Sequence, residues 1–151
     1  MKKPESFLLV DDDADDALLF KETLESLDSG LNFQYAQNGL EALDLLQKKE
    51  QPLPDAIFLD LNMPRMDGKE CLVRLKADEH LKHLPVIIYT TSLRSTDIED
   101  TIQKGAVCFI AKPTSTKELK KLLAFIAENL YDNFERKLNS VSNNFDTFIV
   151  C

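Results

Sequence analysis

The stretch FLLVDDD, residues 7–13, passes from four consecutive apolar residues directly into three aspartates. Three more apolar runs stop in the same way at a polar or charged residue: AIFLD (56–60), VIIYTT (86–91) and VCFIAKP (107–113). Continuous apolar runs of this length are typical of strands buried on both faces of a parallel sheet. In an open α/β sheet the ligand site lies outside the carboxyl ends of the strands. The sequence therefore predicts that carboxylates, a hydroxyl and an ammonium meet at one sheet edge.

Helical patterns alternate with these runs, and a short alternating segment at 33–36 predicts one further strand, at an edge. The predicted helices cover residues 14–27, residues 40–48, a segment after Gly68, a segment from the capping box Thr96-x-x-Glu99 to Gly105, and a segment that the capping box Ser115-x-x-Glu118 opens. This alternation predicts an α/β fold with five helices on the two faces of a parallel sheet. Five strands favour the flavodoxin-like, doubly wound order 2-1-3-4-5, whose switch point lies between the first and third strands.

Length and charge limit the classes of function. The chain has 151 residues, about one domain, and carries 26 acidic against 18 basic residues for a net charge of −8. An acidic protein is a poor non-specific binder of nucleic acid or of anionic membranes. The sequence also lacks an apolar stretch that approaches the ~18 residues of a membrane span. We therefore expect neither nucleic acid nor membrane as a partner.

The cysteines form an odd set, Cys71, Cys108 and Cys151, without CxxC spacing. Cys108 lies within an apolar run, where a small buried apolar residue is the ordinary interpretation. We therefore expect neither a disulfide framework nor a zinc site, and the natural compartment is the reducing cytoplasm.

Residues 131–151 follow the last predicted helix. Apolar residues recur there at intervals of three and four: Tyr131, Phe134, Leu138, Val141, Phe145 and Phe148. This heptad stripe predicts that the segment extends the last helix or forms another helix that pairs with a partner. Against a helix, much of the segment from 139 to 147 consists of weak helix formers. The alternatives are a frayed tail or one that folds back onto its own domain.

Three carboxylates at the expected sheet edge, Asp11, Asp12 and Asp60, indicate a cation site. Two carboxylates about 4 Å apart repel by roughly 4 kcal/mol at an effective dielectric of about 20. A cluster of three is therefore costly unless it keeps protons or binds a cation. Oxygen ligands without a nearby histidine suit Mg²⁺. With the Lys112 ammonium and the Thr90 hydroxyl, the set predicts a site for a divalent cation and a phosphoryl group.

Each residue also has an ordinary structural interpretation. The aspartates at 11–13 could form an acidic turn that caps the following helix. Asp60 could begin a loop, Thr90 could be a strand-end hydroxyl, and Lys112 could extend its ammonium into solvent. The functional interpretation is favoured because all of them fall at strand ends of one sheet.

Three stretches together resemble the receiver domain of two-component response regulators, the family that includes the chemotaxis response regulators: LVDD (9–12), LDLNMPRMDG (59–68) and AKP (111–113). The resemblance covers about residues 5–130. It implies a single receiver domain over residues 1–130, with residues 131–151 as a C-terminal extension that is a helix or an interaction tail.

The resemblance implies how the acidic residues act. Asp60 would be the phosphoacceptor, whose carboxylate attacks the phosphorus of a partner's phosphohistidine. Asp11 and Asp12 would hold Mg²⁺ together with Asp60 and the backbone carbonyl of Asn62.

The resemblance also implies a switch. Thr90 would close onto the phosphoryl group, and Lys112 would pair with it from a Lys112–Pro113 bond that is cis in such proteins. Phe109 falls where the family carries an aromatic residue that changes rotamer when the Thr90 position moves. A phenylalanine has no hydroxyl, so signalling through it would rest on packing alone.

The expected function is that of a stand-alone response regulator. It would receive a phosphoryl group from a histidine kinase or a histidine phosphotransfer protein. It would then signal to a downstream protein target through the fourth helix, fifth strand and fifth helix. The residues after 130 are too few for a DNA-binding output domain, and they would allow a homodimer. Chemistry at Asp60 would be limited to Mg²⁺-dependent self-phosphorylation and autodephosphorylation.

Two other classes of protein fit less well. An aspartate-nucleophile phosphatase usually has a second acid two residues after the nucleophile, where this chain has Asn62. A flavin-binding module on the same topology would offer hydroxyls and amides to the phosphate in its first loop, whereas the aspartates at 11–13 would repel it. The chain has no GxxxxGK[ST] stretch for nucleotide phosphates.

Overall fold

The computed structural model of the chain describes residues 2–27 and 30–151. The four apolar runs form the four central strands, in which every residue is buried: β1 (Ser6–Val10), β3 (Ala56–Leu59), β4 (Val86–Thr90) and β5 (Cys108–Ala111). β2 (Asn32–Ala36) lies at an edge and is partly exposed. The first five strands pair in parallel in the order β2-β1-β3-β4-β5, which confirms the predicted topology.

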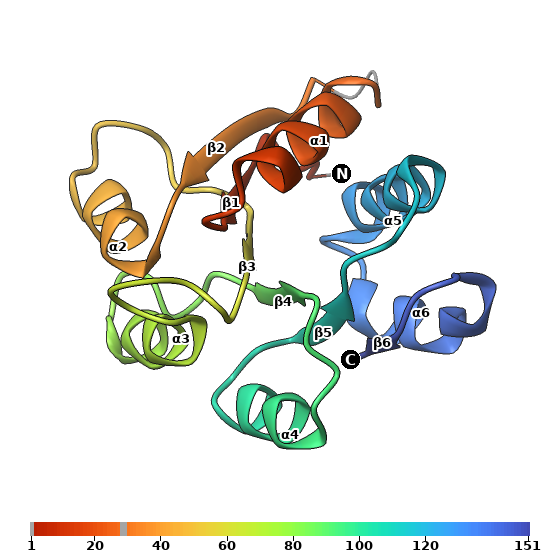
Figure 1. The fold of residues 1–151 in the computed structure, drawn as a ribbon. Coiled ribbons are helices and arrows are strands. Elements are labelled where there is room, and N and C mark those ends of the chain that lie inside the picture. The colour runs from red at the N-terminus through yellow and green to blue at the C-terminus, as the bar shows by residue number, and fades with distance from the viewer. Residues whose placement is uncertain (1, 28–29) are drawn as a thin grey trace.

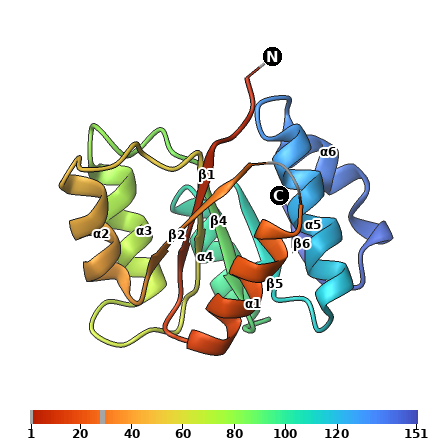
Figure 2. The same cartoon turned by 90° about the horizontal axis from the view of Figure 1, so that it is seen from above.

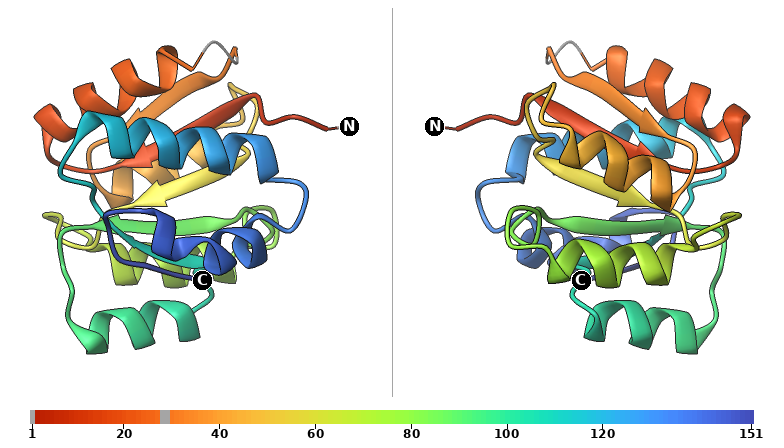
Figure 3. Two further views of the ribbon diagram at one scale, coloured as in Figure 1. Left: turned by 90° about the vertical axis from the view of Figure 1, so that its right-hand side faces the viewer. Right: turned by 90° about the vertical axis from the view of Figure 1, so that its left-hand side faces the viewer.

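Helices cover both faces of the sheet (Figures 1 and 2). One face packs against α1 (Ala14–Glu25) and α5 (Thr116–Asn129), and the other against α2 (Gly39–Gln47), α3 (Gly68–Ala77) and α4 (Ser95–Gln103). The two views of Figure 3 face these two helical layers in turn. Apolar clusters on the two faces therefore hold the carboxyl ends of the strands at one edge of a rigid sheet.

Helix starts follow the N-cap pattern with one exception. Asp13, Asn38, Asp67 and Ser115 each accept a backbone hydrogen bond at the start of α1, α2, α3 and α5. The predicted capping box Thr96-x-x-Glu99 is wrong. α4 begins at Ser95, and its N-cap is Arg94, two residues before Thr96; Arg94 makes no side-chain capping bond within the described ranges.

The segment after α5 folds back onto the domain. It forms α6 (Phe134–Ser140), a 3-10 turn (Ser142–Asn144) and β6 (Ile149–Val150), which adds a sixth, antiparallel strand beside β5 (Figure 1). A heptad helix over the whole segment is therefore wrong. One reason is that Ser140 and Ser142 donate side-chain hydrogen bonds to the carbonyls of Lys137 and Asn139 and so compete with helical bonding.

A disulfide joins Cys108 of β5 to Cys151, and the expectation of no disulfide is wrong. The antiparallel register pairs Phe109 with Val150, so the neighbouring residues Cys108 and Cys151 face each other with their Cα atoms 4.0 Å apart. Cys71 is buried and free. The pairing joins residues 43 positions apart, a proximity that only the docked tail creates.

None of the helices in the described part of the chain is long and apolar enough to cross a membrane.

The buried anchor of α6 gives a stability prediction. Leu138 is fully buried among α6 and the core residues of the α1–α5 face. We expect Leu138→Ala to lower the free energy of unfolding by about 3 kcal/mol, because it leaves a cavity in a packed core. Leu93→Ala is the matched control, since Leu93 is 60% exposed and should change stability by less than about 0.5 kcal/mol. Equal urea midpoints for the two variants would mean that α6 is not docked.

Candidate functional site

An acidic cluster lies where β1 and β3 end. The two strands are neighbours in which Val10 pairs with Leu59, so the next residues, Asp11 and Asp60, leave the sheet side by side. Asp11 and Asp60 are buried and Asp12 is exposed, and one carboxylate oxygen of each lies within 4.8 Å of the others. The structure therefore brings the three predicted carboxylates together.

The loop after β1 divides its aspartates between two tasks. Asp13 is the N-cap of α1 and accepts from the backbone N–H groups of Asp15 and Asp16. Asp11 instead turns inward, and its Oδ1 accepts from Asp13 N at 2.9 Å. The hydroxyl of Tyr35 donates to the Asp11 carbonyl at 2.8 Å and ties this loop to β2. The capping interpretation thus holds for Asp13 alone.

The Lys112 ammonium reaches the same cluster from the end of β5. Its Nζ lies 2.7 Å from Asp11 Oδ2, 2.8 Å from Asp16 Oδ2 and 3.8 Å from Asp60 Oδ2. The Lys112 side chain is only 9% exposed, which excludes the interpretation of a solvent-directed lysine. Every peptide bond in the described ranges is trans, the Lys112–Pro113 bond included, so the expected cis bond is not found.

Burial and neighbouring charges shift the pKa values of this pair in a way that suits a cation site. Burial raises the pKa of Asp11 to about 6, with a further contribution from the charge of Asp60, although Lys112 and the Asp13 N–H oppose the rise. Burial by itself would lower the pKa of Lys112, but its contacts with Asp11 and Asp16 raise that pKa above its ordinary value. The cluster therefore gains from an added positive charge.

The donor set fits a divalent cation. Asp11 Oδ2 is buried, and its partner within the described part of the chain is the Lys112 ammonium, 2.7 Å away. The set offers carboxylate oxygens only, which are the ligands that Mg²⁺ and Mn²⁺ prefer. Asp11, Asp12 and Asp60 are the residues that could hold such an ion.

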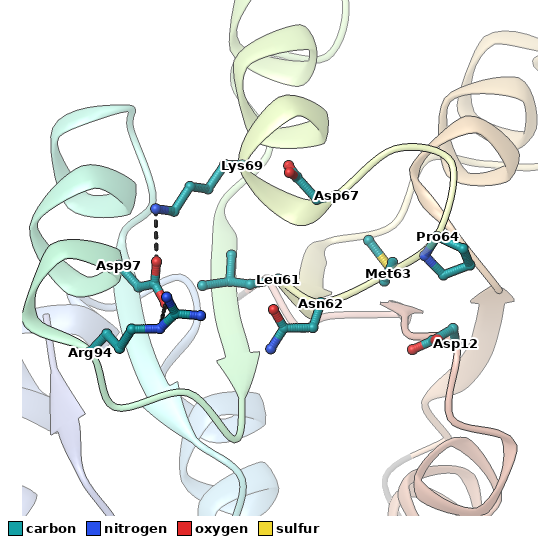
Figure 4. Close-up of a pocket in the computed structure, with 9 residues that line it drawn as sticks. All are labelled: Asp12, Leu61, Asn62, Met63, Pro64, Asp67, Lys69, Arg94 and Asp97. Atoms are coloured by element: carbon teal, nitrogen blue, oxygen red, sulfur yellow. Dashed lines mark ion pairs between the residues drawn. The ribbon is translucent and has the colours of Figure 1, made fainter.

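A pocket of about 680 Å³ opens beside the cluster. Asp12 and Asn62 lie on its walls, and an ion-pair group of Lys69, Asp97 and Arg94 closes the far side (Figure 4). Asn62 thus lines the same pocket as Asp12, and the ligand role expected of its carbonyl stays a prediction. The pocket leaves Asp12, the exposed carboxylate of the cluster, open to solvent.

The two predicted switch residues are buried nearby. Thr90 ends β4, and its carbonyl accepts from Lys112 N at 2.8 Å. Phe109 is fully buried in β5, on the face that α4 covers. Its ring packs edge to face on Phe148 of the C-terminal segment, with ring centroids 6.4 Å apart. The extension thus covers the β5 part of the face through which output was expected.

Sequence reasoning missed three residues of the site. Asp16 shares the Lys112 ammonium, and Tyr35 holds the Asp11 loop. Asp97 accepts from the Ser92 hydroxyl at 2.6 Å and pairs with Lys69 at 2.7 Å, and these partners lower its pKa, Lys69 most strongly. Asp16 lies in the first turn of α1, directly after the acidic run, and this nearness in sequence could have indicated it. The pairings of Tyr35 and Asp97 have no local sequence signal.

Gly68 packs tightly against the loop after β3, because a Cβ there would lie 2.2 Å from the carbonyl oxygen of Asp60 and 2.7 Å from Leu61 Cα. We expect Gly68→Ala to lower stability by about 1–3 kcal/mol and to weaken Mg²⁺ binding in calorimetric titration, because the backbone at Asp60 must shift. Gly30→Ala is the control, since it is strained by its left-handed φ of +73° but meets no atom within 4 Å. Unchanged Mg²⁺ affinity in Gly68→Ala would contradict this role.

Comparison with known proteins gives one consistent family. The response regulator receiver domain model matches residues 7–124. The response regulator Rcp1 of Synechocystis is 32% identical over 124 residues, which cover 80% of this chain and 84% of Rcp1. The chemotaxis protein CheY-3 of Vibrio cholerae is 36% identical over 130 residues, which cover 86% of this chain and 97% of CheY-3.

Solved structures agree with this family. The phosphorylated cyanobacterial phytochrome response regulator RcpA superposes with a TM-score of 0.77 at 30% identity, over 85% of this chain and 94% of RcpA. The Mn²⁺-bound form of Rcp1 superposes with a TM-score of 0.75 at 30% identity, over 86% of this chain and 96% of Rcp1.

Proposed function

Because the chain belongs to the response regulator receiver domain family, we propose that it is switched by transfer of a phosphoryl group to Asp60. The observation that carries the proposal is the convergence on Asp60 of two further carboxylates and a buried ammonium, at the carboxyl ends of β1, β3 and β5. This is an arrangement for charge stabilisation at a phosphorus atom and not for binding a neutral ligand.

The transfer conserves atoms and charge as follows. A carboxylate oxygen of Asp60 attacks the phosphorus of a phosphohistidine on a histidine kinase or a histidine phosphotransfer protein. The new P–O bond forms as the P–N bond breaks, and the released imidazole nitrogen takes up a proton. Asp60 Oδ1 accepts from Leu61 N at 2.8 Å, which leaves Oδ2 as the attacking atom on the side of Lys112.

The neighbouring residues would bind the metal ion and the phosphoryl oxygens. Asp11 and Asp12, with Asp60 and the backbone carbonyl of Asn62, would hold Mg²⁺, which neutralises charge on the phosphoryl oxygens. Lys112 pairs with one phosphoryl oxygen and Thr90 donates its hydroxyl to another. Because Asn62 occupies the place of a second acid, no carboxylate stands two residues after Asp60 to act as a general base in rapid hydrolysis of small substrates. We therefore assign it self-phosphorylation and autodephosphorylation, without turnover of a small substrate.

The output is contact with another protein. We place the regulator in the cytoplasm, where its kinase or phosphotransfer partner meets it, with a downstream protein target or a second copy of the chain as the receiver of the signal. Because the chain carries a net charge of −8, we expect neither nucleic acid nor anionic membranes as its targets. Thr90 and Phe109 pass the change from Asp60 to the surface between α4 and α5.

Incubation of the protein with acetyl phosphate tests the proposal. We expect one phosphoryl adduct in the intact mass spectrum, present with Mg²⁺ and absent with EDTA. Because an acyl phosphate is cleaved by hydroxylamine, treatment should remove the adduct and leave a hydroxamate on the peptide that contains Asp60. Failure to form an adduct with acetyl phosphate or phosphoramidate would reject phosphoryl transfer to this chain.

A further inference from the structure

The C-terminal segment closes the free edge of β5. Two residue pairs make the strand pairing, Phe109 with Val150 and Ile110 with Ile149. Ala111 N donates to the Phe148 carbonyl at 2.9 Å, and the Thr147 hydroxyl donates to the Ala111 carbonyl at 2.6 Å. Ala111 directly precedes Lys112, so these contacts end one residue from the ammonium that faces the acidic cluster.

Side chains of this segment alternate between the two faces of the sheet. Phe148 falls on the α4 side, where it covers the buried Phe109 while 41% of its own surface stays exposed. Ile149 and Cys151 fall on the α5 side and join the core there. The segment is thus a cover over β5 that a single disulfide fastens to Cys108.

The non-covalent hold on this cover is weak. β6 has only two residues, fewer than the roughly 3–10 that are usual for a strand, and it pairs with β5 alone. α6 is held independently, because Phe134 and Leu138 are buried in the core. Loss of the disulfide should therefore free residues 146–151 and leave α6 docked.

We propose that the Cys108–Cys151 bond is a reversible thiol–disulfide switch, opened by a dithiol reductant, that controls whether residues 146–151 cover β5. In the cytoplasm, the compartment that we propose for this regulator, disulfides are usually transient and serve catalysis or redox sensing. The switch itself does not depend on phosphoryl transfer to Asp60.

Exposure decides which sulfur reacts. Cys108 is fully buried, whereas Cys151 is partly exposed. A thiolate of the reductant therefore attacks Cys151 Sγ, a mixed disulfide forms, and Cys108 leaves as a thiolate that takes up a proton. The second thiol of the reductant then attacks the reductant's first sulfur, which is bonded to Cys151, and Cys151 leaves as a thiolate that takes up a proton. The protein gains two thiols, and the dithiol becomes a cyclic disulfide.

Hydrogen exchange of the full chain in oxidised and reduced dithiothreitol, without any phosphoryl donor, tests this proposal. We expect the amides of residues 146–151 to exchange more than about tenfold faster after reduction, while those of α6 stay protected. Alkylation by N-ethylmaleimide, followed by peptide mass analysis, should modify Cys151 only in the reduced protein.

Two variants separate the switch from a general effect of reductant. Cys151→Ser should show fast exchange of residues 146–151 in both redox states. Cys71→Ser should behave like the native protein, because Cys71 is buried and lies outside the bond. The proposal is overturned if residues 146–151 exchange equally in both states of the native protein, or if Cys151 is alkylated under oxidising conditions. Loss of protection in α6 together with β6 would also overturn it, because the bond would then support the fold and not the cover.

Discussion

The Asp60→Asn variant is expected to form no phosphoryl adduct with acetyl phosphate while it keeps the native fold. An amide nitrogen is not a nucleophile at phosphorus, and the amide oxygen carries no charge to attack with. The side-chain oxygen of asparagine can still accept the hydrogen bond that Leu61 N donates to Asp60 Oδ1 at 2.8 Å. Circular dichroism of this variant should therefore show the native fold, while its intact mass should show no phosphoryl adduct.

Asp44→Asn is the matched control for this experiment. Asp44 is an exposed carboxylate of α2 that pairs with Lys48 and lies outside the acidic cluster. It should take up the phosphoryl group as the native protein does. An adduct of equal yield on Asp60→Asn would place the reactive group elsewhere and would refute Asp60 as the phosphoacceptor.

The Lys112→Met variant is expected to lose about 3–5 kcal/mol of folding free energy at neutral pH, because the ammonium compensates buried carboxylates. Methionine fills the volume of the lysine stem but leaves Asp11, which is fully buried, facing Asp60 without a counter-charge. Urea unfolding measures the loss. We expect millimolar Mg²⁺ to restore more stability to this variant than to the native protein, because the cation replaces the missing positive charge.

The loss of folding free energy in Lys112→Met should depend on pH because the pKa of Asp11 is shifted in the folded chain. Its pKa of about 6 in the folded chain lies above the ordinary value of 3.8, so the folded state binds the proton more tightly than the unfolded state. Stability from this group is therefore greatest below the ordinary value and falls as the pH rises through the folded pKa. Removal of Lys112 raises the pKa of Asp11 further, so the loss should be largest at neutral pH and should shrink toward pH 5.

Lys48→Met is the control for the removal of a lysine. Lys48 pairs with Asp44 at 3.0 Å, but both side chains are more than half exposed. Solvent screens an exposed pair of this kind, so its loss should change stability little and nearly independently of pH between about 5 and 7. An equally small, pH-independent loss in Lys112→Met would contradict a role of Lys112 in balancing the cluster.

The positions of the carboxylates could be predicted, but not which of them is shared with the lysine. Asp11 and Asp60 directly follow buried strands, and parallel strands end at the same edge of the sheet. The apolar runs and the sheet topology therefore predict that these two carboxylates lie close together. Asp11 and Asp13 are the same residue type only two positions apart, yet Asp13 caps α1 and Asp11 turns inward. Only the backbone path into α1 distinguishes them, because Asp13 has its side chain at the N–H groups of Asp15 and Asp16.

Sequence alone determined the apolar runs, the strand order that they favour and the reactive residue at the end of each run, because these depend on local periodicity and on parallel-sheet topology. Tertiary structure decided the docking of residues 131–151 and the bond between Cys108 and Cys151. The heptad spacing of that segment fits a helix, yet burial of Phe134, Leu138 and Phe145 on the existing core bends it into a short helix, a turn and an edge strand. Disulfide pairing depends on the register of two segments that no local pattern brings together.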